Sequence, residues 1–145
     1  VSLGTDGSFD GTPGDTMQAA HFVAQTYADP ISAEALLEMQ TVNAAAAAGL
    51  EADLGILEAG KRADVVVRSP AAVEAYPGNH PVHQLALTMG SGSVETVLVN
   101  GEVVFSRRRS TRVDEREVCR AVSMSVAERA TRLGVDLTGD WPIID

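Results

Sequence analysis

The sequence predicts an α/β or α+β fold of about one domain, in which several helices and three or four strands share a core. Apolar residues recur at helical spacing from Thr16 to Ala28, and again after Ser32. β-Branched runs flank the pair Asn100-Gly101, and another apolar run covers Val65–Val67. The chain of 145 residues is long enough to bury a core.

Two helices are expected in the N-terminal part. The helix that begins at Thr16 should end before Asp29-Pro30, because the residue before a proline disfavours the helical conformation. Ser32 is a suitable N-cap for the second helix, and Glu34 lies in its first turn. This second helix is expected to run without interruption to Gly49.

The middle of the chain has the spacing of strands and turns. The stretch from Leu54 to Val67 predicts a short strand, then a turn at Gly60, and then a fully apolar strand that includes Val65–Val67. A short helix is expected over Val82–Met89, followed by a flexible link at Gly90–Ser93.

The C-terminal part should contain a hairpin and a long helix. Asn100-Gly101 predicts a type I′ turn between two strands. Asp114 and Glu117 form a capping box, and Gly134 ends the helix. Cys119 lies beside the stripe expected to be buried and is interpreted as structural. That stripe comprises Val118, Val122, Val126, Ala130 and Leu133.

Composition excludes several classes of partner. The net charge of −9 argues against nucleic acid and against an anionic membrane surface. No apolar run approaches the roughly 18–20 residues that a transmembrane helix needs. The single cysteine excludes an internal disulfide and fits a reducing compartment, so a cytoplasmic location is expected. Arg107–Arg109 can be a phosphate site or a solvated strand edge, and the acidic chain favours the edge.

The opening stretch carries the most informative side chain. Val1-Ser-Leu3 is interpreted as a strand that ends at the polar turn Gly4-Thr-Asp-Gly7 and places Asp6 beyond its end. An aspartate at the C-terminal end of a barrel strand can ligate a metal or accept a proton from attacking water. The same aspartate can close an Asx turn, and these seven residues alone favour that simpler interpretation.

Two other functions of this loop fit less well. Four of its residues match places of a calcium-binding loop, but the twelfth place holds Met17 instead of a bidentate Glu. The loop also has no lysine, and its aspartates would repel a phosphate. The four calcium-loop matches are Asp6, Ser8, Asp10 and Gly11.

The order of motifs along the chain is more specific than any one of them. The strongest is Leu54-Gly-Ile-Leu-Glu-Ala-Gly-Lys-Arg-Ala-Asp-Val-Val-Val67. The others are Gly4-Thr-Asp-Gly7, Thr41-Val-Asn-Ala-Ala45, Gly49-Leu50, His80-Pro-Val82, Gly92-Ser-Val94 and Val97-Leu-Val-Asn-Gly-Glu-Val103. Together they resemble the C-terminal part of the metal-dependent amidohydrolase superfamily. The resemblance points to the branch of cytosine deaminases, adenosine-derivative deaminases and triazine hydrolases.

The resemblance implies an α/β fragment: the last βα unit of a (β/α)8 barrel, the C-terminal part of a small β-sandwich and a C-terminal helix. Residues 1–52 would be the end of the barrel, 53–113 the sandwich part, and 114–145 the helix and tail. The chain begins with Val1 inside an apparent strand, so a fragment or a processed chain is expected.

The resemblance also implies that Asp6 is both a metal ligand and the group that moves the proton of the attacking water. The metal would be zinc or iron. The family's histidine ligands lie on earlier strands, and His21, His80 and His83 do not match their positions. The spacing of His80 and His83 could hold a metal, but a loop containing Pro81 is a poor scaffold for one.

The function expected from the resemblance is hydrolysis of a non-peptide C–N bond, with deamination of a small heterocycle. A single aspartate cannot hold a catalytic zinc, which takes at least three protein ligands. The missing N-terminal barrel segment or another chain would therefore supply the rest. The alternative is a non-catalytic sandwich module, or the subunit of a split enzyme, that acts through dimerisation. An uncovered barrel edge would favour a homo-oligomer in each case.

Overall fold

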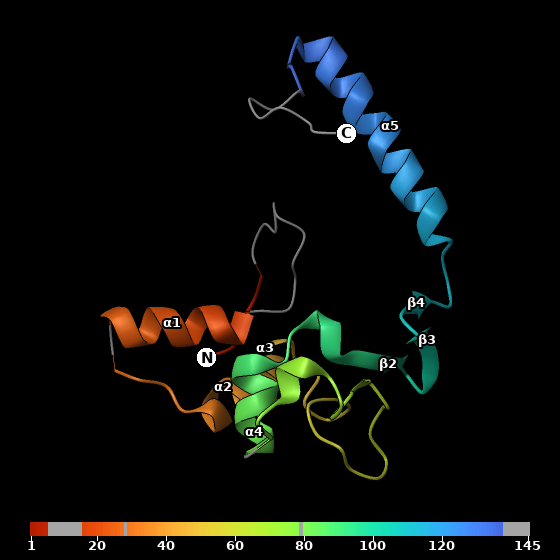
Figure 1. The fold of residues 1–145 in the computed structure, drawn as a ribbon. Helices are drawn as coiled ribbons and strands as arrows, with labels where there is room; N and C mark the ends of the chain where they lie inside the picture. The colour runs from red at the N-terminus through yellow and green to blue at the C-terminus, as the bar shows by residue number, and fades with distance from the viewer. Residues whose placement is uncertain (6–15, 28, 79, 138–145) are drawn as a thin grey trace. The chain divides into compact units, whose positions relative to one another are not determined.

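The structure is a computed structural model that describes residues 1–5, 16–27, 29–78 and 80–137. The chain divides into two compact units, Val1–Arg108 and Arg109–Asp145. Figure 1 shows the course of the chain through the helices and strands of each unit. The domain boundaries expected at residues 52 and 113 remain a prediction.

The first unit begins with three helices, namely α1 (Thr16–Tyr27), α2 (Ala33–Gln40) and α3 (Val42–Ala47). The expected helix from Thr16 is confirmed. The expected cap of the second helix is confirmed as well, because the Ser32 hydroxyl oxygen accepts a hydrogen bond from the backbone N–H of Ala35 at 3.2 Å.

The expectation of one uninterrupted helix from Ser32 to Gly49 is wrong. Thr41 leaves the helical conformation, with φ −119° and ψ −88°, and separates α2 from α3. Its hydroxyl donates to the carbonyl oxygen of Leu37 at 2.7 Å, a bond that commonly bends helices. Gly49 ends α3 with a left-handed φ of +70°, as a glycine after a helix does.

A small apolar core holds α1 and α2 against the segment after residue 80 (Figure 1). Leu36 is fully buried at its centre. Burying one such side chain stabilises a fold by about 1.5–3 kcal/mol, so this cluster fixes the mutual positions of these elements. The buried members are Met17, Ala33, Leu36 and Ala86, and partly buried Leu3, Ala20, Ile31, Leu37, Val82 and Leu87 pack against them.

The short strand expected from Leu54 is not formed, and residues 54–64 make turns instead. Polar groups of this segment bond back to the preceding residues rather than to a neighbouring strand. The Arg62 backbone N–H donates to the Asp53 carbonyl oxygen at 2.9 Å, and the Lys61 ammonium donates to that of Glu51 at 2.6 Å. These local bonds satisfy groups that a strand would need a partner to satisfy.

The first unit also contains an antiparallel sheet, with strands in the spatial order β1 (Val65–Arg68), β2 (Val94–Val99) and β3 (Glu102–Ser106). Val65 lies opposite Leu98 in the register of β1 and β2. Asn100 and Gly101 have left-handed φ values of +51° and +80°. These values confirm the expected type I′ hairpin turn.

The segment between β1 and β2 folds into four short helical turns, namely η1 (Val73–Ala75), α4 (Pro81–His83), the π-helical η2 (Gln84–Thr88) and η3 (Ser91–Ser93). The helix expected over Val82–Met89 is thus present, with a π-helical second half. The link expected to be flexible is instead held in place. An Arg68 guanidinium nitrogen donates to the carbonyl oxygens of Met89 and Gly90, both at 2.6 Å, and Ser93 is 1% exposed.

Residues 1–5 form no strand, which corrects the interpretation of Val1–Leu3. The backbone N–H of Leu3 donates to the carbonyl oxygen of Met39 in α2 at 3.2 Å. A barrel strand exists only by pairing with its neighbours, and no described residue pairs with this segment as a strand. The Leu3 side chain packs against the helical core instead.

In its described residues, 109–137, the second unit contains the two-residue strand β4 (Arg109–Ser110) and the helix α5 (Glu115–Leu133). Asp114 caps α5 by accepting from the backbone N–H groups of Arg116 and Glu117, and Gly134 ends the helix with φ +64°. The expected N-cap at Asp114 and the expected helix end at Gly134 are both confirmed.

The expectation that the apolar stripe of α5 is buried is wrong for this chain. Ala130 is buried, but the other four apolar positions are about half exposed or more: Val118 49%, Val122 56%, Val126 48% and Leu133 70%. Cys119 is exposed as well, so it is not a packed structural residue. The helix carries the expected apolar stripe, but little within the described chain covers it. Over the described residues, every helix is too short or too polar to traverse a bilayer.

Candidate functional site

Asp6, the residue predicted to bind metal and move a proton, lies outside the described residues. The described residues on both sides of its loop are attached to the same end of α2. Leu3 bonds to Met39 through the backbone, and the Thr16 hydroxyl donates to the side-chain oxygen of Gln40 at 3.2 Å. The C-terminal end of α2 therefore anchors both flanks of the segment that contains Asp6.

A second group of candidate ligands lies at the opposite end of α2. Glu34, His80 and His83 each present one ligand atom, and these atoms all lie within 4.8 Å of one another. The two imidazole rings contact edge to face, with centroids 4.8 Å apart and an interplanar angle of 64°. All three side chains are exposed. Among the described residues, this is the one group of His, Cys, Asp and Glu with metal-ligand spacing.

The backbone around these histidines forms a short helix, α4, where a proline-containing loop was expected. Pro81 occupies the first turn of α4, where its fixed φ suits a helix. His80 is the N-cap of α4, and its Nδ1 accepts from the backbone N–H of His83 at 3.4 Å. The loop expected at Pro81 is therefore a short helix in this structure, which His80 caps and in which His83 lies.

The carboxyl of Glu34 favours the charged form. The hydrogen bond from its own backbone N–H is the largest factor that holds the pKa of Glu34 below its ordinary value. Some desolvation opposes this shift, whereas the Ser32 hydroxyl and positive charge on His80 and His83 lower the pKa further. Glu34 is thus a carboxylate at neutral pH and faces two imidazoles.

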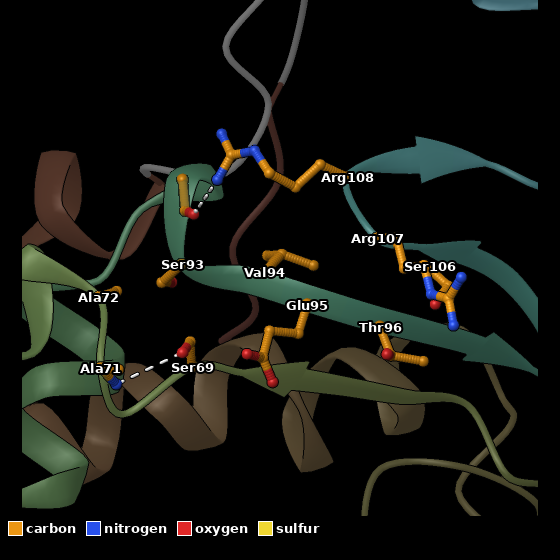
Figure 2. Close-up of a pocket in the computed structure, with 11 residues that line it drawn as sticks. Ser69, Ala71, Ala72, Ser93, Val94, Glu95, Thr96, Ser106, Arg107 and Arg108 are labelled. Atoms are coloured by element: carbon orange, nitrogen blue, oxygen red, sulfur yellow. Dashed lines mark hydrogen bonds between the residues drawn. The ribbon is translucent and has the colours of Figure 1, made fainter.

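A cavity of the first unit has different chemistry. It encloses about 450 Å³ beside β2 and the turn after β3. Figure 2 shows Glu95, Thr96, Arg107 and Arg108 around it, and the Arg108 guanidinium donates to the Gly92 carbonyl oxygen at 3.2 Å. Histidine, cysteine and aspartate are absent from its lining within the part of the chain that the structure describes. The cavity therefore offers hydroxyl and guanidinium groups, and Glu95 contributes the one carboxylate among its described lining residues.

The third histidine is placed elsewhere. His21 lies on α1, and its Nδ1 is buried with no hydrogen-bond partner among the described residues. Sequence reasoning singled out His80 and His83 but treated Glu34 only as a first-turn acid of its helix. No local signal connects Glu34 to the histidines, because their proximity depends on the packing of α2 against α4.

Comparison with known proteins supports the resemblance seen in the motifs. The chain matches the profile of the amidohydrolase family over residues 1–104. It is 36% identical over 138 residues to a 5-methylthioadenosine/S-adenosylhomocysteine deaminase of Desulforudis audaxviator, covering 91% of this chain and 31% of the relative.

Solved structures show the same relationship. An adenosine deaminase from Xanthomonas campestris with bound zinc superimposes with a TM-score of 0.72 at 26% identity, over 79% of this chain and 27% of that one. The atrazine chlorohydrolase of Arthrobacter aurescens complexed with zinc gives a TM-score of 0.58 at 28% identity, over 77% and 23% respectively.

The chain spans roughly a third or less of each of these proteins. The family profile nevertheless covers most of the chain, from the opening stretch to β3. The described fold, helices with a small antiparallel sheet, agrees with that of the amidohydrolase structures. The chain therefore belongs to the amidohydrolase family.

Proposed function

We propose that this chain is the C-terminal part of a metal-dependent hydrolase that removes an amino group from a small nitrogen heterocycle. In this proposal residues 1–52 complete a (β/α)8 barrel, residues 53–113 belong to a small β-sandwich and residues 114–145 follow as helix and tail. The observation that carries the proposal is the family match over residues 1–104, which includes Asp6 and the Leu54–Val67 motif.

The substrate class follows from the relatives. The deaminases are named for adenosine derivatives, and the chlorohydrolase for atrazine. Each of these is an aromatic nitrogen heterocycle with a leaving group on a ring carbon. We therefore propose a substrate of this type, with an exocyclic amine that leaves as ammonia.

Asp6 is proposed to act in two ways. Its carboxylate is one ligand of a divalent metal, zinc or iron, and the metal supplies an acidified water when bound. The same carboxylate accepts a proton from the attacking water and returns it to the leaving amine. Water thus gives its oxygen to the ring carbon, the C–N bond breaks, and ammonia departs with the transferred proton.

Asp6 is not a complete catalytic ligand set. Catalytic zinc sites use three protein ligands, and one carboxylate supplies only one of them. We propose that the remaining ligands come from a barrel segment outside these 145 residues or from a partner chain. The functional unit is then the assembled enzyme.

Metal removal tests this proposal in the assembled enzyme. Ammonia release from aminated heterocycles should fall to background after chelation and return when zinc or iron is added. Ammonia release that survives complete removal of metal would refute the metal-dependent reaction.

The exposed stripe of α5 favours a second candidate, a module or split-enzyme subunit that acts through dimerisation. Four apolar side chains on one face of α5 are 48–70% exposed, and such a face is normally covered by protein. Sedimentation of the purified chain at rising concentration should show a homodimer if a second copy covers it. A chain that stays monomeric would exclude this candidate.

A further inference from the structure

The packing of α2 against α4 brings together a donor set that neither element has alone. Leu36 of α2 is fully buried, and Ala86 and Val82 pack in the same core cluster. Glu34 lies two residues before Leu36, and His80 and His83 flank Val82. Core burial therefore determines where the three ligand side chains meet.

The distances are close to those of a bound metal ion. Zinc binds imidazole nitrogen at about 2.0–2.1 Å and carboxylate oxygen at about 2.0–2.2 Å, so tetrahedral ligand atoms lie roughly 3.4 Å apart. The ligand atoms of Glu34, His80 and His83 are within 4.8 Å. Because all three side chains are exposed, small rotations can close this gap without disturbing the core.

The ligands are already partly oriented. The Ser32 hydroxyl supports the charged carboxylate of Glu34, and the His80 ring is held by the N–H of His83. The latter bond is long, at 3.4 Å, so a metal ion can replace it at small cost.

The donor set selects the class of ion. Two imidazoles and one carboxylate bind zinc with one coordination position left open. Imidazole also suits copper and nickel, whereas calcium and magnesium prefer oxygen ligands. One carboxylate and two neutral imidazoles leave a single positive charge on a divalent complex, which the acidic chain, with net charge −9, tolerates.

We propose that Glu34, His80 and His83 form a surface site for one zinc ion, a site that uses neither Asp6 nor any residue assigned to hydrolysis. The site joins the first turn of α2 to the first turn of α4. Bound zinc therefore stabilises the packing of these two elements, since an ion that binds the folded state alone raises its stability. The proposal is independent of the proposed hydrolase function.

Zinc titration of the purified, chelator-treated chain tests the proposal. Isothermal calorimetry should give one zinc per chain, and zinc should raise the unfolding temperature. His80→Asn, His83→Gln and Glu34→Gln should each weaken zinc binding at least about tenfold, because even residues that only orient a ligand have effects of 10–100-fold.

Matched controls separate this site from other ligands. Glu38 lies one helical turn after Glu34 on the same exposed face. Glu38→Gln should therefore leave zinc affinity unchanged. His21→Gln and Asp6→Asn should also leave it unchanged, with circular dichroism confirming that each variant is folded. Failure of the folded wild-type chain to bind zinc would overturn the proposal. Zinc binding that survives in the double variant His80→Asn/His83→Gln would also overturn it, and so would zinc binding that is lost in Asp6→Asn.

Discussion

At the scale of single residues, Glu34 combines a helix-start position with contacts that come from a distant segment. Its carboxyl receives its own backbone N–H and lies beside His80 and His83. Both features favour the ionised carboxylate over the protonated acid. The pKa of Glu34 in the folded chain therefore lies below that of a free glutamate, which is about 4.3.

This shift predicts a pH dependence of stability. A group whose pKa is lower in the folded state stabilises the fold above its unfolded pKa, and loses this effect as pH falls through the folded value. Glu34→Gln should therefore be less stable than wild type at pH 7, and the difference should shrink below about pH 4.3. Urea unfolding at several pH values, with chelator present, measures it. A difference that stays constant with pH would contradict the assigned shift.

Gly55 is the residue at which backbone conformation and packing act together. Its φ is +100°, and an added Cβ would lie 3.0 Å from the Ala45 Cβ and 3.2 Å from the Val42 Cα. Gly60 has a similar φ of +97° but open space around the same position. The two glycines differ mainly in the contact with α3.

The pair allows a matched test. Gly60→Ala should cost about 1–2 kcal/mol of unfolding free energy from the left-handed conformation alone. Gly55→Ala should cost about 1–3 kcal/mol more, because its methyl group overpacks the contact with α3. Denaturant unfolding of both variants measures the difference. Equal losses would show that the approach of residue 55 to α3 is not tight.

At the scale of elements, local signals predict ends and turns well. Ser32 caps α2, Asn100-Gly101 makes the hairpin turn, and Asp114 and Gly134 bound α5. Each of these depends on a few neighbouring residues, such as a side chain that accepts backbone N–H groups or a left-handed φ. A sequence pattern contains that information completely.

Elements whose formation depends on distant contacts were predicted poorly. Val1–Leu3 has strand-forming residues, but residues 1–5 have no strand to pair with among those described. The α5 stripe follows helical spacing, yet only Ala130 is buried. Spacing predicts which face is apolar, but what covers that face depends on the rest of the structure.

At the scale of the whole molecule, family membership came from the order of motifs. No single motif specifies the fold, whereas their succession from Gly4 to Val103 matches the region covered by the family profile. The candidate site residues also differ in whether the sequence alone could identify them. Asp6 was assigned by resemblance, whereas the meeting of Glu34 with His80 and His83 could only be seen once α2 and α4 were packed together.

The proposed function depends on Asp6, which we propose binds the metal and moves the proton in the assembled enzyme. The most direct measurement is kcat for ammonia release by Asp6→Asn, with Asp10→Asn, from the same loop, as the control. Loss of a positioned general base alone lowers the rate by about 10²–10⁴-fold. We expect a loss of at least this size for Asp6→Asn, with the fold intact and near-normal turnover for Asp10→Asn. Turnover of Asp6→Asn at the wild-type rate would contradict it.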